Sequence, residues 1–163
     1  MAVSFNFRTF LALFRPELYT PYELALRDMA HRNYEQAMGR LDAILADPQT
    51  AAPERAAAAN KRGVALVELE RKDEARAAFE QALEIVPKFA PALVNIGNLH
   101  LEAGETDEAI KYYESAVRSD EDYALAHHNL GVAYKRLGRT GDSVRELRKA
   151  HRLEGRVVRK QRK

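Results

Sequence analysis

Hydrophobic and small residues recur along the chain at the spacing of amphipathic helices. Residues 92–104 read ALVNIGNLHLEAG, and four of them fall on one helical face: Leu93, Ile96, Gly97 and His100. After Gly104 a second helical pattern begins, with an apolar face made of Ala109, Ile110, Tyr113, Ala116 and Val117. A glycine at the end of a helix supplies the left-handed conformation that ends it at little cost. This stretch therefore predicts two helices joined by a short turn.

The same pair of helical patterns occurs three times, with a period of about 34 residues. Three series of residues keep this spacing: Gly63, Gly97 and Gly131; Phe79, Tyr113 and Leu147; and Ala82, Ala116 and Ala150. A fixed period of this length is typical of stacked helical repeats. The predicted units are residues 56–89, 90–123 and 124–157.

These units resemble the tetratricopeptide repeat (TPR), a helix–turn–helix motif of about 34 residues. Gly97 stands at the family's Leu-Gly position, and its second-helix signature is matched by Ala109, Tyr113 and Ala116. Pro87 takes the place of the terminal proline. The resemblance implies an all-α, right-handed superhelical solenoid of helix–turn–helix repeats. It also implies a non-catalytic module or adaptor that binds other proteins.

A degenerate copy of the repeat is predicted in residues 18–55. Its first helix would run from about Pro21 to Ala30, and a second would begin near Tyr34. The interval from Ala37 to Ala75 is longer than the regular period, so four residues are inserted, and we place them between Pro48 and Pro53. In the next unit Glu70 replaces the turn glycine, and we expect that turn to be less well defined.

Charge is distributed unevenly along the chain although the net charge is only +2. Residues 56–123 carry 14 acidic and 8 basic side chains, whereas residues 124–163 carry 3 acidic and 12 basic ones. This asymmetry favours contact with a polyanion or assembly guided by charge. The chain has no cysteine, which excludes disulfides and is compatible with the cytoplasmic location that we expect. No apolar run is long enough to span a bilayer.

Residues 1–17 form a separate amphipathic segment, which Pro16 ends. Its apolar stripe consists of Phe7, Phe10, Leu11 and Phe14. One hypothesis is a helix that caps the first repeat, since end caps are expected in repeat stacks. The alternative is an anchor for a partner or a membrane surface. Arg8 interrupts the segment and no small-residue cleavage site follows, so we expect no secretory signal.

Basic residues dominate the C-terminal helix and the tail at residues 158–163. The predicted basic surface comprises Arg145, Arg148, Lys149, Arg152, Arg156, Arg159 and Lys160. Three hypotheses remain open: a solvated helix with a basic tail, a site for an anionic lipid, nucleic acid or acidic protein, and contact with the acidic middle of another copy. Nucleic acid is disfavoured because no aromatic residues are interleaved for base stacking.

The first helices of TPR units line a concave groove, and the resemblance assigns this chain's groove residue by residue. The predicted partner-binding residues are Asn60, Val64, Val67, Val94, Asn95, Asn98, Leu101, His128, Asn129, Val132 and Lys135. Amide side chains can hold a peptide backbone while the apolar positions receive its side chains. Local structural roles for the asparagines are the alternative.

One TPR subtype grips the terminal carboxylates of heat-shock chaperones with a Lys, Asn and Arg clamp. Of the five clamp positions in residues 56–157, only Asn95 matches, so we do not expect that specificity. We find no phosphate loop, zinc-protease motif or nucleophile signature, and therefore expect no enzyme activity and no cofactor. No metal site is predicted, since the adjacent His127 and His128 point to different helix faces. A scaffold for assembly or for a membrane surface, using both chain ends, is the alternative function.

Overall fold

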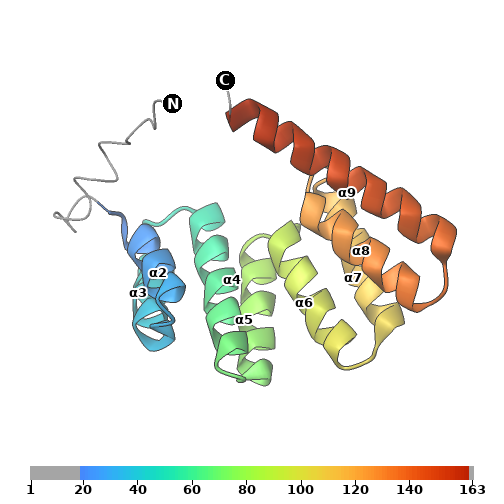
Figure 1. Ribbon diagram of the computed structural model, residues 1–163. Helices are drawn as coiled ribbons and strands as arrows, with labels where there is room; N and C mark the ends of the chain where they lie inside the picture. The colour runs from blue at the N-terminus through green and yellow to red at the C-terminus, as the bar shows by residue number, and fades with distance from the viewer. Residues whose placement is uncertain (1–18, 162–163) are drawn as a thin grey trace.

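The computed structural model describes residues 19–161 of the chain. This part folds into eight α-helices and contains no strand: α2 (Pro21–Ala30), α3 (Tyr34–Ala46), α4 (Ala52–Glu68), α5 (Lys72–Ile85), α6 (Ala90–Glu102), α7 (Thr106–Ser119), α8 (Ala124–Arg136) and α9 (Thr140–Gln161). The helices form four consecutive hairpins that stack in chain order from α2–α3 to α8–α9 (Figure 1). The fold is an all-α solenoid, as the sequence predicts.

Local sequence determines where the helices begin. Thr20 caps α2: its hydroxyl accepts a hydrogen bond from the Glu23 backbone N–H at 3.1 Å, and the Glu23 carboxylate accepts one from the Thr20 N–H at 2.9 Å. Proline occupies the first turn of α2, α4 and α6, where the missing N–H is not needed for the helix.

All four hairpins use the same turn between their helices. One residue in each turn has a left-handed backbone: Arg32 (φ 61°), Glu70 (φ 60°), Gly104 (φ 84°) and Gly138 (φ 73°). The N–H of the next residue then donates to a carbonyl in the last turn of the first helix, and this bond measures 2.9 Å at Arg71, Glu105 and Arg139. The turn at Glu70 is thus as regular as those at the glycines, so the expectation that it is less well defined is wrong.

The core lies between the two helices of each hairpin and continues from one hairpin to the next. At Gly63 and Gly97 the helices approach so closely that an added Cβ would lie 2.4 Å and 2.5 Å from the rings of Phe79 and Tyr113. One buried cluster joins α4, α5 and α6, and a second joins α6, α7 and α8. The regular period of the sequence therefore reflects one repeated close contact between helices.

The four inserted residues lengthen a helix. α4 has 17 residues, whereas α6 and α8 have 13 each, and α4 begins four residues earlier in the repeat. The four residues add about one turn at the N-terminal end of α4, so the faces that pack in the repeat keep their orientation. Several contacts join the degenerate hairpin to the next one; among them, Arg62 forms an ion pair with Asp42 at 2.8 Å, and Met38 packs into the cluster around Phe79.

The last helix exceeds the length of the repeat. α9 has 22 residues, compared with 14 in each of α5 and α7. It continues to Gln161 through residue 157, where the sequence places the end of the last repeat. Leu153 is buried at 4% exposure, so α9 still packs against the stack in this region. Within residues 19–161, no helix is long and apolar enough to cross a membrane.

Candidate functional site

The first helices of the last three hairpins form a continuous surface, because α4 contacts α6 and α6 contacts α8. We call this surface the inner face (Figure 1). All eleven predicted groove residues lie on its three helices. The stacking of the hairpins brings them together from corresponding positions of successive repeats.

Asparagine side chains join the helices of the inner face. Asn95 donates a hydrogen bond to Asn60 at 2.8 Å, and Asn129 donates to Asn98 at 2.8 Å. The same Asn98 oxygen also accepts a hydrogen bond from the Tyr113 hydroxyl at 2.8 Å. The amides thus have structural roles, which the sequence left open. Each amide also has donor or acceptor sites that these bonds do not use.

Burial divides the predicted groove residues into two groups. Val94 is fully buried and Asn60 is only 5% exposed, because both pack beneath the surface between neighbouring helices. These two side chains therefore offer no surface for a ligand. The others are half-buried or exposed: Val64, Val67, Asn95, Asn98, Leu101, His128, Asn129, Val132 and Lys135.

The prediction missed Leu125, which is 46% exposed on α8. It precedes His128 by three residues, Val132 by seven and Lys135 by ten, so these four lie along one side of the helix. That spacing is visible in the sequence and could have identified it. A single exposed apolar side chain is common on protein surfaces, so what distinguishes Leu125 is its position in line with the other accessible residues of α8.

Models of this repeat match four overlapping stretches of the chain. One described as "TPR repeat" matches residues 97–138, and three described as "Tetratricopeptide repeat" match residues 22–88, 78–111 and 124–155. The matches span the degenerate hairpin as well as the regular ones. The chain belongs to the tetratricopeptide repeat family. Proteins built from such repeats present extended concave surfaces to their partners.

Solved TPR-like structures share the fold of this chain. The crystal structure of MamA has 21% identity and a TM-score of 0.66, and the match covers 93% of this chain and 87% of that one. BtubC (BKLC) from P. vanneervenii has 19% identity and a TM-score of 0.68, with 88% and 66% covered. The second TPR of Spaghetti (RPAP3), solved with the HSP90 peptide SRMEEVD, has 19% identity and a TM-score of 0.56, with 60% and 91% covered. No curated protein matches the chain.

Two histidines serve the packing of the TPR stack. His127 is 5% exposed, with Nδ1 at 2.8 Å from the Glu146 carboxylate and Nε2 at 3.0 Å from the Glu121 carbonyl oxygen. His100 is half-buried and stacks on Tyr112 at 5.2 Å between ring centroids. Within the part of the chain that the structure describes, no group of three His, Cys, Asp or Glu side chains could hold a metal ion.

The predicted basic surface lies along α9, the last helix of the TPR stack. Arg148 and Arg152 are exposed, whereas Arg145 forms ion pairs with Asp142 at 2.9 Å and Glu146 at 3.0 Å. The remaining members are Lys149, which is half-buried, and Arg156, which lies 3.9 Å from Asp122. The side chains of Arg159 and Lys160, and the whole N-terminal stripe of Phe7, Phe10, Leu11 and Phe14, lie outside the described residues.

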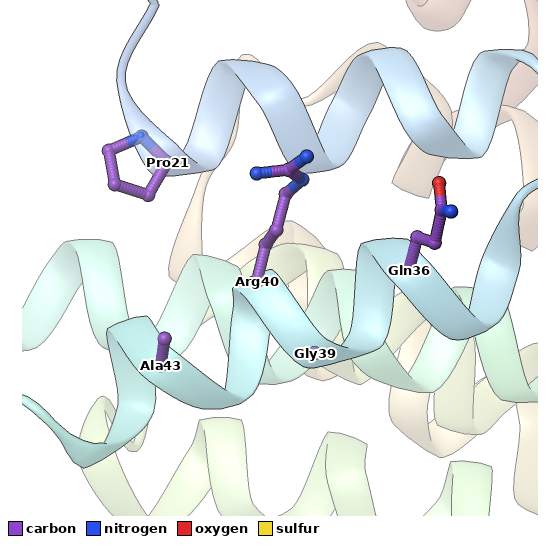
Figure 2. Close-up of a pocket in the computed structure, with 5 residues that line it drawn as sticks. All are labelled: Pro21, Gln36, Gly39, Arg40 and Ala43. Atoms are coloured by element: carbon purple, nitrogen blue, oxygen red, sulfur yellow. The ribbon is translucent and has the colours of Figure 1, made fainter.

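A shallow cavity of about 490 Å³ lies on the first TPR hairpin, away from the inner face. Its lining consists of Pro21, Gln36, Gly39, Arg40 and Ala43 (Figure 2). Gln36 and Arg40 extend from α3 toward α2, and the absent side chain of Gly39 leaves space between them. Arg40 is already paired with Asp28 at 2.7 Å, so its charge is compensated within the hairpin.

Proposed function

We propose that the inner face of α4, α6 and α8 binds an extended peptide segment or a helix of a partner protein. The observation that carries this proposal is the line of accessible side chains on α8, in which Leu125 is 46% exposed beside His128, Val132 and Lys135. Half-buried apolar residues continue the surface onto the other two helices: Val64, Val67 and Leu101. An apolar strip interrupted by polar groups can bind a peptide, because the apolar residues contact its side chains and the polar groups form hydrogen bonds with its backbone.

Each component of the surface has a role in this proposal. Leu125 and Val132 receive apolar side chains of the ligand. Asn98 and Asn129 use their remaining amide sites to bond its backbone, which requires no change in their existing bonds. His128 and Lys135 lie at the α8 side and favour a ligand with acidic residues there.

The structural neighbour solved with an HSP90 peptide supports a peptide as the ligand class for a stack of this shape. Its peptide ends in acidic and apolar residues. Only Asn95 of this chain matches the five positions of a carboxylate clamp, so we propose that the ligand is held along its length and not by its terminal carboxylate.

The experiment selects ligands from a displayed library of random peptides on the intact chain and measures their affinity by fluorescence anisotropy. The variant Leu125→Glu with Val132→Glu places two charges on the inner face. The matched control is Val144→Glu, because Val144 is 41% exposed but lies on α9. We expect the double variant to lose about tenfold or more in affinity, which is about 1.4 kcal/mol, and the control to bind as the wild type does.

Thermal unfolding of each variant establishes that the stack remains folded. Equal affinity of the peptides for the double variant and the wild type would mean that they bind outside the inner face, and would contradict the proposal. Loss of binding in the Val144→Glu control as well would show a general effect of added negative charge and would also contradict the proposal.

A further inference from the structure

The outer helix faces of the stack carry a gradient of charge at equivalent repeat positions. In α5 four exposed residues are spaced by four, three and four positions and so form one helical stripe: Asp73, Ala77, Glu80 and Glu84. We call this the acidic stripe. Its three carboxylates form no ion pair with any residue that the structure describes.

The equivalent stripe of α7 has both signs of charge. It consists of Asp107, Lys111, Glu114 and Arg118. Lys111 forms an ion pair with Glu108, and Arg118 lies 3.8 Å from Glu114. Hydrogen bonding to Lys111 lowers the pKa of Glu108, as expected for a paired carboxylate. The charges of the middle stripe are therefore compensated locally.

The equivalent stripe of α9 is basic. It consists of Gly141, Arg145, Arg148 and Arg152, each two repeat periods after its counterpart in α5. Arg148 and Arg152 are exposed and, within residues 19–156, form no ion pair. We call Arg145, Arg148 and Arg152 the basic stripe.

The two charged stripes cannot meet within one molecule. α5 and α9 belong to hairpins separated by the α6–α7 hairpin, and the stack places these elements in order (Figure 1). Arg145 is paired within α9, so the charges of Asp73, Glu80 and Glu84 in the acidic stripe and of Arg148 and Arg152 in the basic stripe are the ones left, within the described side chains, to solvent ions or to another molecule. A second copy of the chain offers the opposite stripe on a helix with the same spacing of charges.

We propose that the basic stripe of α9 in one copy docks on the acidic stripe of α5 in another copy. The two stripes occupy the same positions of the repeat, so Glu80 and Glu84 of one copy have Arg148 and Arg152 as counterparts in the next. The proposed contact is head to tail: each copy uses one stripe and leaves the other free for a further copy, so that the association is heterologous and continues along a chain of copies.

The proposal is independent of the peptide-binding function. The stripes lie on the second helices of the hairpins, whereas the inner face is formed by the first helices. Variants of the inner face should therefore associate as the wild type does, and stripe variants should still bind peptide.

Charge reversal provides a sharp test by sedimentation velocity. One variant, Glu80→Arg with Glu84→Arg, has two basic stripes. The other, Arg148→Glu with Arg152→Glu, has two acidic stripes. We expect the wild type to associate with rising concentration at an ionic strength of about 0.01 M and to be monomeric at about 1 M, because the screening length falls from roughly 30 Å to roughly 3 Å. Each variant alone should associate about tenfold or more weakly than the wild type.

An equimolar mixture of the two variants should recover association. The α5 stripe of the first variant is basic and the α9 stripe of the second is acidic, so these two stripes again carry opposite charges. All these substitutions are at exposed positions, and circular dichroism with thermal unfolding verifies that both variants are folded. A wild type that stays monomeric at low ionic strength would overturn the proposal. Association that both variants retain, or that their mixture fails to recover, would overturn it as well.

Discussion

Gly97 lies so close to Tyr113 that a Cβ atom on the glycine would stand 2.5 Å from Cε1 of the ring. This contact joins the two helices of one hairpin. The same relationship occurs between Gly63 and Phe79, at 2.4 Å, and in a looser form between Gly131 and Leu147, at 2.8 Å. The glycine of the repeat is therefore required by the side chain that faces it.

Replacing Gly97 with alanine should destabilise the stack. The added methyl overlaps a fully buried ring, and overpacking of this kind costs roughly 1–3 kcal/mol. Gly131→Ala should cost less, because the branched end of Leu147 can shift. Gly39→Ala is the matched control, since nothing lies within 4 Å of its added Cβ and alanine favours the helix by about 0.5–1 kcal/mol. Urea unfolding measures all three, and a stabilised Gly97→Ala would contradict the packing argument.

Substitutions at two left-handed turn residues should change the free energy of unfolding in opposite directions. Glu70 has φ 60°, a conformation that costs a non-glycine residue roughly 1 kcal/mol, so Glu70→Gly should raise the free energy of unfolding by about 0.5–1 kcal/mol. Gly104→Ala should lower it by about 1 kcal/mol, and entirely through the backbone, since its added Cβ meets no atom within 4 Å. Equal effects in one direction, measured by thermal unfolding, would show that other contacts determine these turns.

Stability should fall at alkaline pH through the buried tyrosines. Burial raises the pKa of Tyr113 to about 12, above its value of about 10 in the unfolded chain. The unfolded state therefore loses this proton first as the pH rises, and the stability present below pH 10 is lost toward pH 12, by roughly 2 kcal/mol. Urea unfolding of the wild type and Tyr113→Phe at several pH values measures the slope.

The Tyr113→Phe variant should show a smaller loss over that range but not a flat curve. Burial also raises the pKa of Tyr134 to about 12, and Tyr134 remains in the variant. Identical pH slopes for the two proteins would exclude Tyr113 as a contributor.

The same substitution at the adjacent residues His127 and His128 should have different effects on stability. Both ring nitrogens of His127 face acceptors, the Glu146 carboxylate and the Glu121 carbonyl oxygen, and phenylalanine would remove both hydrogen bonds. The Glu146 carboxylate would keep only its pairing with Arg145. His127→Phe should therefore cost about 1–3 kcal/mol. His128→Phe should change stability by less than about 0.5 kcal/mol, because His128 is exposed. Similar losses for the two variants in urea unfolding would contradict the role assigned to His127.

The fold could be predicted because its determinants are local and repeated. Gly63, Gly97 and Gly131 make the same helix contact in three repeats, so the pattern found in one repeat can be checked against the other two. The turn at Glu70 was harder to predict, because Glu70 takes the left-handed conformation without being a glycine, within the same backbone hydrogen bonding as the other turns.

The candidate site could be predicted from the sequence less fully than the fold. The positions of Asn60, Asn95 and Asn98 on the inner face follow from the repeat, but their hydrogen bonds depend on the distance between successive first helices. Burial of Val94 depends on the same distance, whereas its counterpart His128 is exposed in the last repeat. The spacing alone does not distinguish these two environments, because both residues occupy the same position of the repeat.

The added turn of α4 shows which changes of length such a stack can accept. The four extra residues precede Ala56, so they extend the N-terminal end of α4 by about 6 Å, and the contact between Gly63 and Phe79 later in the chain is unaffected by them. A first helix of the stack can therefore extend beyond the shared core as a separate edge while the packing inside its own hairpin is kept.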